Sequence, residues 1–598
     1  MSGEILVHVS SGETAVDEVG SDPAVGEDLD ARLARGPLSV DETLALARRL
    51  AGEVAGIHAR GVAHGRIGPR RVILPDGAVG RARLLPADDR GVGEPSYFSP
   101  EQARGDAAGP SADMFAIGAL LFACLTGKGA FAGTSSTAVL ARVLLEDTPR
   151  VSMIRNDIPD ALDSLVARLL SKSPLDRPRD GADLAFELAV LDTSDNGYGM
   201  SEPTAPDTVA GRDRARIYVV LAAPGGAFTG TAGELGARVE AAVAPLGARV
   251  SLLVDGAALA LLSGRGISAD HAVKAARTAL AMRSVLPGAS VAAVTGAGVR
   301  VAEVPLGEMV ERAARMLAQT SGAAAIVIDE DLAGLLDAPF VIGGDARGLL
   351  LEGEGDAPPA SRPLGVEPGV LIGLESEIGA LEALFRGAAD EELGRVALIV
   401  GAQGAGKSRL VRELVDRIER RGEPVSLWIA RGDPSRSSAP FALVADLLRA
   451  MTGIREGEPP TIQRQKLRGR VRRHVAPRHA GRVADHLAIL AAIPAASSDD
   501  LARDDAPRSG TPARALEDLL SVECDARPVV VVLEDLHAAD RASLDLLGKT
   551  AAALTERRFL LVALARPEVL ERFPDLWEHE RPAVIVLGPP HASSTVSP

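Results

Sequence analysis

The stretch VALIVGAQGAGKSRLVRELVDRI, residues 396–418, decides the fold of the C-terminal part of the chain. It begins with an apolar, β-branched run that ends at Val400, and it finishes as an amphipathic helix. Between them lies the pattern G-x-x-x-x-G-K-S, which forms a phosphate-binding loop when a strand precedes it and a helix follows it. Backbone N–H groups at a helix N-terminus bind phosphate oxygens, and the helix dipole favours an anion there. The residues expected to bind a nucleotide are Gly401, Gly404, Ala405, Gly406, Lys407, Ser408 and Arg409.

Two side chains of this loop carry the chemistry of the motif. Lys407 is expected to place its charge on the β- and γ-phosphates, and the hydroxyl of Ser408 is expected to bind Mg²⁺. The predicted cofactors are therefore ATP and Mg²⁺. The alternative is a glycine-rich turn that binds nothing, and the flanking strand and helix argue against it.

A second apolar strand, PVVVVLEDLHAADR at residues 528–541, ends in two acidic residues. In P-loop proteins such acids hold Mg²⁺ and polarise the attacking water. Glu534 is expected on the metal side and Asp535 as the water-activating base, so the predicted catalytic residues are Asp535, Glu534 and Lys407. Solvated acids at a strand end are the alternative. A third strand, in FLLVALARPE (559–568), ends at Arg566, which either senses the γ-phosphate or lies on the surface.

Longer stretches surround these motifs, namely LIGLESEIGALEALF (371–385), LWIARGDPSRSSAPFALVADLLRA (427–450), LEDLHAAD and ARPE. Together with GAQGAGKS they resemble the ATPase module of the STAND and Orc1-like AAA families of bacterial regulators. The resemblance implies an α/β P-loop NTPase with a parallel sheet flanked by helices over residues 370–598. The winged-helix lid and helical arm of that family are expected to be missing, because the chain stops at Pro598.

The first part of the chain contains DETLALARRLAGEVAGIHARGVAHGRIGPRRVIL (41–74), GEPSYFSPEQARG (93–105), SADMFAIGALLFACLTGKGAFAG and LLSKSPLDRPRDGADL. In this order they resemble the mostly helical C-lobe of bacterial serine/threonine protein kinases over residues 28–191. The resemblance places structural residues of that fold at Glu101 with its partner Arg177, and at Asp113 and Gly118. Residues 1–27 are expected to be disordered or a remnant, too short for the missing N-lobe.

The residues that carry kinase chemistry are replaced in this segment. The resemblance aligns Arg66 with the aspartate that accepts the substrate proton, and an arginine cannot act as a base. Gly68 stands where the family has a lysine, Arg71 where it has the Mg²⁺-binding asparagine, and Pro86 where it has the metal-binding aspartate. A catalytically inactive kinase remnant that docks protein partners is therefore expected. The alternative is residual kinase activity that uses Asp88 or Asp89.

The middle segment, residues 214–351, alternates strand-like runs such as ARIYVVLAA (215–223) and ARVSLLVDGAALALLSG (248–264) with helical stretches. It resembles the class III nucleotide cyclase domain, an α/β fold that works as a dimer. Such cyclases need two metal-binding aspartates. The resemblance places one at Asp255 but Ala223 at the other; Glu311 and Arg315 stand at the ribose and transition-state positions, respectively. A pseudo-cyclase that supports homodimerisation is expected.

Composition limits the remaining classes of function. The net charge of −16 over 598 residues disfavours a nucleic-acid binder, because phosphate backbones attract surplus positive charge. A basic run at 464–482 either grips nucleic acid or an acidic partner, or forms a solvated helix face, which is the favoured interpretation. Two distant cysteines, no signal sequence and no membrane-spanning run indicate a cytoplasmic protein. Residues 192–213 and 352–369 are expected to be linkers.

The complete pattern resembles the kinase–cyclase–ATPase fusion regulators of high-GC bacteria. It predicts a multidomain signalling protein that binds Mg-ATP and hydrolyses it slowly. The predicted partners are ATP and other proteins that dock on the kinase-like and cyclase-like segments, without a membrane. A scaffold that binds partners without hydrolysing ATP is the alternative.

Overall fold

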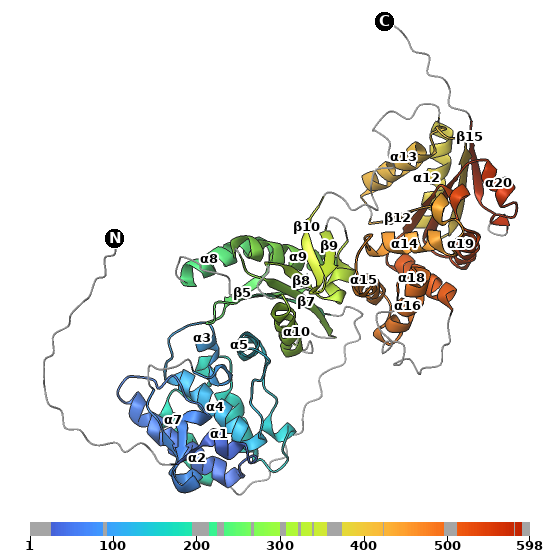
Figure 1. Cartoon of the computed structure of the whole chain (residues 1–598). Coiled ribbons are helices and arrows are strands. Elements are labelled where there is room, and N and C mark those ends of the chain that lie inside the picture. Colours follow the sequence, from blue (N-terminus) through green and yellow to red (C-terminus); the bar gives the residue numbers. More distant parts are fainter. Residues whose placement is uncertain are drawn as a thin grey trace, which may run out of the picture. The chain divides into compact units, whose positions relative to one another are not determined.

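The computed structural model of the chain is shown in Figure 1. It divides into two compact units, residues 1–207 and 208–598, and each is described by itself. Among the residues described, no helix is long and apolar enough to span a bilayer. The described residues are 26–87, 93–193, 215–223, 232–264, 268–286, 288–298, 306–320, 324–337, 340–355, 374–422, 424–494, 511–578 and 581–588.

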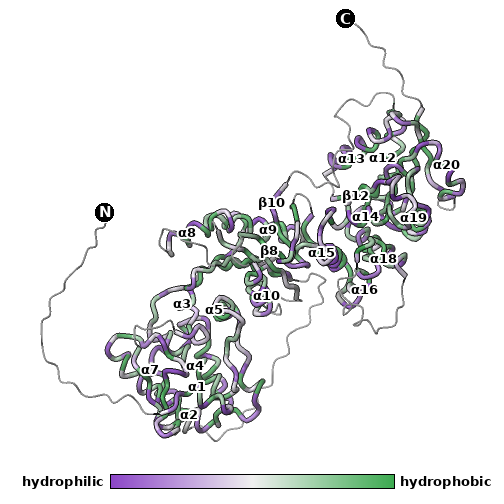
Figure 2. Tube along the Cα trace, viewed as in Figure 1, coloured by the Kyte–Doolittle hydropathy of each residue, from purple (hydrophilic) through white to green (hydrophobic). Residues whose placement is uncertain are grey.

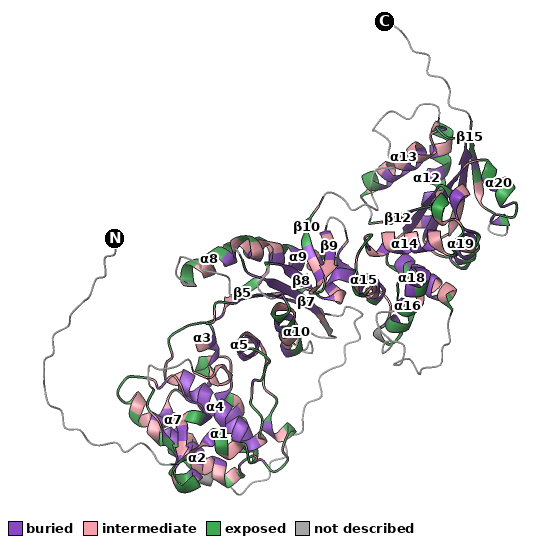
Figure 3. Ribbon diagram, in the orientation of Figure 1, coloured by how far each residue is buried: buried purple, intermediate pink, exposed green. Residues whose placement is uncertain are grey.

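The first unit is mostly helical and is built around the helix α4, Pro110–Thr126. Nearly all of this helix is buried (Figures 2 and 3), since it is apolar on every side and α2, α6 and α7 pack around it. A small antiparallel sheet in the order β1-β2-β3 lies beside the helices. The elements are β1 Glu27–Asp28, α1 Leu29–Leu33, α2 Val40–His58, β2 Val72–Leu74, β3 Arg83–Leu84, α3 Pro100–Ala103, α5 Ser136–Leu145, α6 Asp160–Leu169 and α7 Gly181–Thr193.

The second unit begins with a seven-stranded sheet in the order β5-β6-β4-β7-β8-β10-β9. Its first six elements follow a β-α-β-β-α-β order with antiparallel pairing around β4. Strand β10 continues to Glu354, so the first three residues of the expected linker 352–369 belong to the sheet. The elements are β4 Ala215–Ala222, α8 Ala232–Val243, β5 Arg249–Leu252, β6 Ala258–Gly264, α9 Ser268–Val285, β7 Val291–Gly298, α10 Leu306–Ala318, β8 Ile326–Ile328, α11 Glu330–Leu335, β9 Phe340–Asp345 and β10 Gly348–Glu354.

The C-terminal part of this unit, from residue 374 onward, is a five-stranded sheet in the order β12-β13-β14-β11-β15. Every neighbouring pair is parallel, which confirms the predicted sheet. Successive residues of β11 point to opposite faces, so Ile399 packs under α12 and α13 while Leu398 packs under the remaining helices. The elements are α12 Glu375–Asp390, β11 Arg395–Gly401, α13 Lys407–Arg421, β12 Ser426–Arg431, β13 Val529–Glu534, α19 Arg541–Ala553, β14 Phe559–Ala565, α20 Glu568–Arg572 and β15 Ala583–Leu587.

Between β12 and β13, the described residues form the helices α14 Ala442–Thr452, α15 Pro460–Arg472, α16 Pro477–Leu490 and α18 Pro512–Ala526. The basic run at 464–482 lies in α15 and α16, and the expectation of a solvated face is wrong for its first half. Lys466 and Arg470 are each only 5% exposed. Helix α15 packs against α11, so the middle sheet and the parallel sheet belong to one compact unit.

Candidate functional site

The phosphate loop connects the end of β11 to the start of α13. Gly404 and Gly406 have φ angles of 82° and 91°, in the left-handed region that favours glycine. Gly406 is also the N-cap of α13, and the first turn of a helix has backbone N–H groups without intrahelical partners. The glycines therefore aim these N–H groups at the space above β11, where an anion can accept from them.

Close packing holds the loop against its own strand. A Cβ on Gly401 would lie 3.1 Å from Cβ of Leu587 and 3.2 Å from Cβ of Ala405, which is buried. Contacts this short leave almost no room for a side chain at the end of β11. The loop thus follows the strand closely, in the conformation that a phosphate cradle requires.

Lys407, the first residue of α13, bends back over this loop. Its Nζ donates to the carbonyl oxygens of Gly401 and Ala402, at 2.6 and 2.9 Å. Burial lowers the pKa of Lys407, and the charge of Arg566 lowers it further, while Asp535 and Glu568 act in the opposite direction. The lysine therefore lies within electrostatic reach of two other predicted site residues, Arg566 and Asp535.

The sheet order explains why these residues meet. Strand β14 lies between β11 and β13, and all three are parallel, so their carboxyl ends reach the same edge. Arg566 directly follows β14. Glu534 is the last residue of β13, and Asp535 directly follows it. Ligands of parallel α/β sheets bind at this edge.

Both acids lie beside Arg431, but they differ in exposure and in how closely they contact it. Glu534 is 5% exposed and accepts from Nε of Arg431 at 3.0 Å and also from its Nη2. Asp535 has a left-handed backbone with φ of 52°, and its carboxylate is half exposed. The Asp535 carboxylate lies 3.8 Å from Nε of Arg431, and its charge raises the pKa of Lys407. The assignment of Glu534 to the metal side and of Asp535 as the water-activating base stays a prediction.

The residues available for Mg²⁺ fit the way this ion binds beside a nucleotide. Ser408 is the second residue of α13 and is half-buried beside the loop. Mg²⁺ keeps several waters and needs only one or two protein oxygens in addition to phosphate. A hydroxyl from Ser408 and a water-bridged carboxylate from Asp535 or Glu534 are sufficient donors. Arg409, the third residue of α13, is half-buried as well.

Sequence reasoning missed two residues of this site, Arg431 and His537. Arg431 is the last residue of β12 and is in register with Glu534. Its place at the end of the strand-like run LWIAR could have indicated that it lies at the same sheet edge as the acids. His537 lines an open pocket of about 550 Å³ together with Arg566, Glu568, Glu571 and Arg572. Burial and the charge of Arg566 lower the pKa of His537, which favours its neutral form.

In the first unit, a carboxylate organises the segment aligned with the kinase catalytic loop. The fully buried Asp113 accepts from the backbone N–H groups of His64 and Gly65 at 2.6 and 2.7 Å. It also lies 2.9 Å from Nε2 of His58. This carboxylate therefore fixes the backbone at residues 64 and 65.

The positions that the resemblance aligns with kinase catalytic residues contain cations and small residues. Arg66 is half-buried, and Gly68 is buried. Arg71 donates from Nη1 to the carbonyl oxygen of Pro86 at 2.8 Å, so a guanidinium bridges the two positions aligned with metal ligands. The alternative acids, Asp88 and Asp89, lie outside the described residues.

The expected structural residues of the first unit are in place. Arg177 has a fully buried side chain and donates to both carboxylate oxygens of Glu101, at 2.8 and 3.1 Å. A Cβ on Gly118 would lie 2.6 Å from Cβ of Leu169, so α4 and α6 touch closely at this glycine. These contacts fix the fold without supplying a reactive group.

In the middle segment, the four predicted positions lie in three parts of the fold. Ala223 follows β4 and donates its backbone N–H to the carbonyl oxygen of Ser290 at 2.9 Å. Asp255 lies in the turn between β5 and β6, where its side chain accepts from the backbone N–H of Ala257. Glu311 and Arg315 lie one turn apart on α10. The methyl group of Ala223 cannot bind a metal ion.

Comparison with known proteins now complements this geometry. Residues 370–562 match the family model described as AAA ATPase domain. The chain is 32% identical over 174 residues to serine/threonine-protein kinase PknL of Mycobacterium tuberculosis, covering 26% of this chain and 44% of PknL. It is 29% identical over 182 residues to PknK of the same organism, covering 29% of this chain and 16% of PknK. The chain thus spans less than half the length of these relatives.

The crystal structure of the PknI kinase domain of Mycobacterium tuberculosis is also similar in part. The identity is 26%, the match covers 28% of this chain and 64% of that chain, and the TM-score is 0.24. The chain therefore combines a segment homologous to mycobacterial serine/threonine kinases with an AAA ATPase domain.

Proposed function

We propose that the chain is a cytoplasmic regulatory protein whose STAND-type AAA ATPase domain binds Mg-ATP and hydrolyses it slowly. The observation that carries this proposal is the shared edge of three parallel strands, where the glycine loop follows β11, Asp535 follows β13 and Arg566 follows β14. The two cations, Lys407 and Arg566, can stabilise the negative charge of the β- and γ-phosphates, and the carboxylate can accept a proton from the attacking water.

The proposed mechanism assigns one task to each group. N–H groups of the first turn of α13 bind phosphate oxygens, and Lys407 exchanges its two carbonyl acceptors for the β- and γ-phosphates. Arg566 stabilises charge on the γ-phosphate, and Asp535 accepts a proton from the attacking water. Ser408 and a water-bridged acid would hold Mg²⁺, which would supply neutralisation of the phosphate charge. Turnover is expected to be slow because we assign no arginine finger, a group worth about 10³- to 10⁵-fold in rate.

We propose that the kinase-like segment is catalytically inactive and docks protein partners. The support is chemical, because Arg66 cannot be a general base and the Arg71–Pro86 contact occupies the metal-ligand positions. The competing function is residual kinase activity through Asp88 or Asp89. Autophosphorylation that persists in Lys407→Ala would establish that alternative.

We further propose that the middle segment is a pseudo-cyclase and a site of homodimerisation. Its β-α-β-β-α-β order is compatible with the resemblance, and Ala223 removes one of the two metal-binding carboxylates. Sedimentation of the purified chain tests the dimer, and an assay for cyclic nucleotide formation tests the missing activity.

Titration calorimetry with ATP, with and without Mg²⁺, tests the principal proposal on the whole chain. Binding that is lost in Lys407→Ala, with phosphate release that also requires Lys407, is the expected result. Binding without turnover would favour the non-hydrolysing scaffold. An absence of binding in the wild type would refute the proposal.

A further inference from the structure

The middle segment and the ATPase domain touch at two glycines. A Cβ on Gly334 of α11 would lie 2.0 Å from the carbonyl oxygen of Gly469 in α15. A Cβ on Gly469 would lie 2.3 Å from the carbonyl oxygen of Glu330. Neither position leaves room for a side chain, so the two helices cross with their backbones in direct contact.

Helix α15 also contributes to the core of the middle sheet. Ile462 is 2% exposed and packs within the apolar cluster that β4 to β10 form with their helices. Its Cγ2 would lie 2.6 Å from a Cβ on Gly344. The buried Lys466 donates its Nζ to the carbonyl oxygen of Ile342 at 2.8 Å and pairs with Glu458 at 2.6 Å. The middle sheet is therefore covered by a helix of the ATPase domain.

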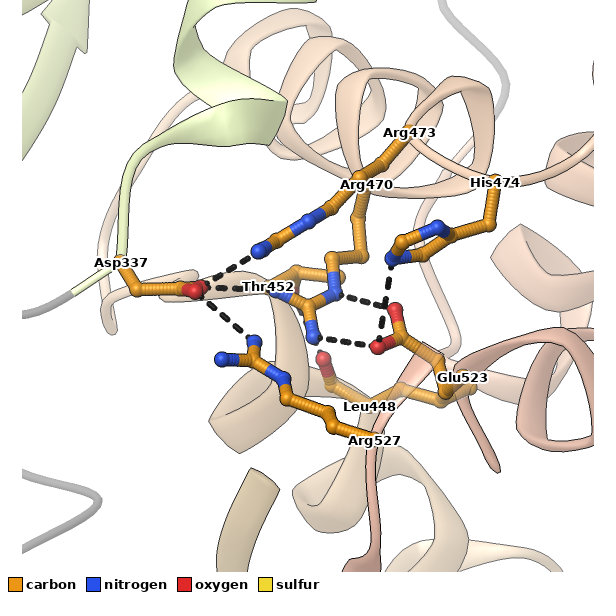
Figure 4. Close-up of polar contacts among 8 residues, drawn as sticks. All are labelled: Asp337, Leu448, Thr452, Arg470, Arg473, His474, Glu523 and Arg527. Atoms are coloured by element: carbon orange, nitrogen blue, oxygen red, sulfur yellow. Dashed lines mark hydrogen bonds and ion pairs between the residues drawn. The ribbon is translucent and has the colours of Figure 1, made fainter. Parts of the chain in front are cut away.

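An ionic cluster at the edge of this contact centres on Asp337 (Figure 4). Arg470, Arg473 and Arg527 all donate to its carboxylate, at 2.9, 2.9 and 2.8 Å. Burial alone would raise the pKa of Asp337, but the three guanidinium groups outweigh burial and hold the pKa below its usual value. One carboxylate of the middle segment thus faces three arginines of the ATPase domain.

Arg470 connects this cluster to the strands of the nucleotide site. It contacts the fully buried Glu523 of α18, with Nε 2.8 Å from Oε1 and Nη2 3.0 Å from Oε2. Its guanidinium also lies 5.3 Å from the ring centroid of Trp428 in β12. The charge of His474, 3.7 Å from Glu523, is suppressed because burial lowers its pKa to about 4. Asp337 and Glu523 together therefore balance most of the positive charge.

The cluster holds the beginning of the strand whose end carries the two acids. Arg527 donates its backbone N–H to the carbonyl oxygen of Glu523 at 3.1 Å and lies two residues before β13. Strand β13 is buried and hydrogen-bonded on both sides, so its position at Val529 fixes its position at Glu534. Arg527 therefore connects the Asp337 cluster to the start of β13.

We propose that the middle segment is the built-in partner of the ATPase domain, and that Asp337 is a positioning residue that holds β13 through the three arginines. Loss of the Asp337 carboxylate should loosen the start of β13 and misplace Asp535 at its end. The docking itself does not depend on nucleotide, whereas the effect on turnover rests on the function proposed above.

The test uses the full chain with Asp337→Asn, and with Asp331→Asn as the matched control. Asp331 lies on α11, which ends two residues before Asp337. Its Oδ1 is paired with Nη1 of Arg472 at 3.5 Å. In Asp337→Asn, hydrogen exchange of peptides from α15 and from residues 523–534 should accelerate about a hundredfold, because Arg473 and Arg527 lose their counter-charge and Arg470 keeps only Glu523. Trp428 emission should shift as well, since Arg470 lies against its ring. Equal exchange in the two variants would overturn the proposal.

The kinetic arm separates positioning from a general loss of structure. In Asp337→Asn, kcat for ATP should fall about tenfold while KM stays within about twofold, since misplaced groups slow the chemical step. If Asp337→Asn does not fold, Arg473→Gln removes one of the three donors and should give the same pattern in weaker form. A normal kcat in a variant with accelerated exchange would refute the link to β13.

The outcomes also distinguish this proposal from the proposed function. If the wild type neither binds nor hydrolyses ATP, the proposed function fails, yet the exchange comparison without nucleotide still decides the docking. Lys407→Ala supplies the reverse control, because it should lose nucleotide binding while the exchange of α11 and α15 stays unchanged.

Discussion

Arg431 and Glu534 form an ion pair across the last positions of two neighbouring parallel strands. The buried Glu534 accepts from both Nε and Nη2 of Arg431, while Asp535, one residue later, is half exposed and lies 3.8 Å from the same guanidinium. The two adjacent acids are thus expected to contribute unequally to catalysis.

Substitution of each acid by its amide measures this difference. Asp535→Asn should lower ATP turnover by about 10²-fold or more, because it removes the general base. Glu534→Gln should have a smaller effect on turnover and on nucleotide affinity, since its partner Arg431 is exposed to solvent. Phosphate-release assays with both variants check the order, and a larger loss in Glu534→Gln would contradict it.

Asp540 ties the starts of two helices together and should be important for stability. It is 3% exposed and accepts from the N–H groups of Ser543, Phe441 and Leu443, and from the Ser543 hydroxyl. Asp540→Ala should destabilise the ATPase domain by about 2 to 4 kcal/mol, because several buried donors lose their acceptor.

Unfolding in urea, followed by fluorescence, measures the effect of Asp540→Ala. Both tryptophans of the chain, Trp428 and Trp577, lie in the ATPase domain, so the signal reports on this domain directly. The exposed Asp545→Ala is the control and should change the midpoint little. Equal midpoints for the two variants would contradict the role assigned to Asp540.

Asp329 should give the second unit a pH-dependent stability. Burial raises its pKa to about 6, against the charge of Arg312. Between about pH 4 and 6 the folded state then binds more protons at this site than the unfolded state, so this contribution to stability falls as the pH rises. Relative to Asp329→Asn, the free energy of unfolding of the wild type should fall by roughly 2 to 3 kcal/mol as the pH rises through this window. Above about pH 6, the difference between the two proteins should stay constant. Calorimetric unfolding at several pH values checks the difference, and parallel curves would contradict it.

Arg177 should be essential for the fold of the first unit and irrelevant to nucleotide binding. Its guanidinium is fully buried against Glu101, so Arg177→Met should destabilise this unit by about 3 to 5 kcal/mol. Arg179→Met removes an exposed ion pair nearby and serves as the control. Hydrogen exchange of α4 measures the effect, and calorimetry with ATP should show unchanged affinity in both variants.

The local parts of the candidate site were predictable from the sequence. The glycine loop and the acid-tipped strand follow from motifs that fix backbone conformation within a few residues, and the parallel sheet follows from apolar strands that alternate with helices. The Arg431–Glu534 pair depends on strand register, which the motif alone does not specify. The Asp337 cluster depends on contacts between residues far apart in the chain, and charge pattern alone suggested a solvated face for α15 instead.

The place of Ile462 in the core of the middle sheet has a practical consequence for fragments of this protein. A C-terminal fragment that begins within residues 352–369 would lack the middle sheet, so the apolar and basic side chains of α15 that pack against it would be exposed to water. Such pieces are expected to aggregate, whereas a fragment that begins before β4 retains both sides of the contact and is the better choice for crystallisation.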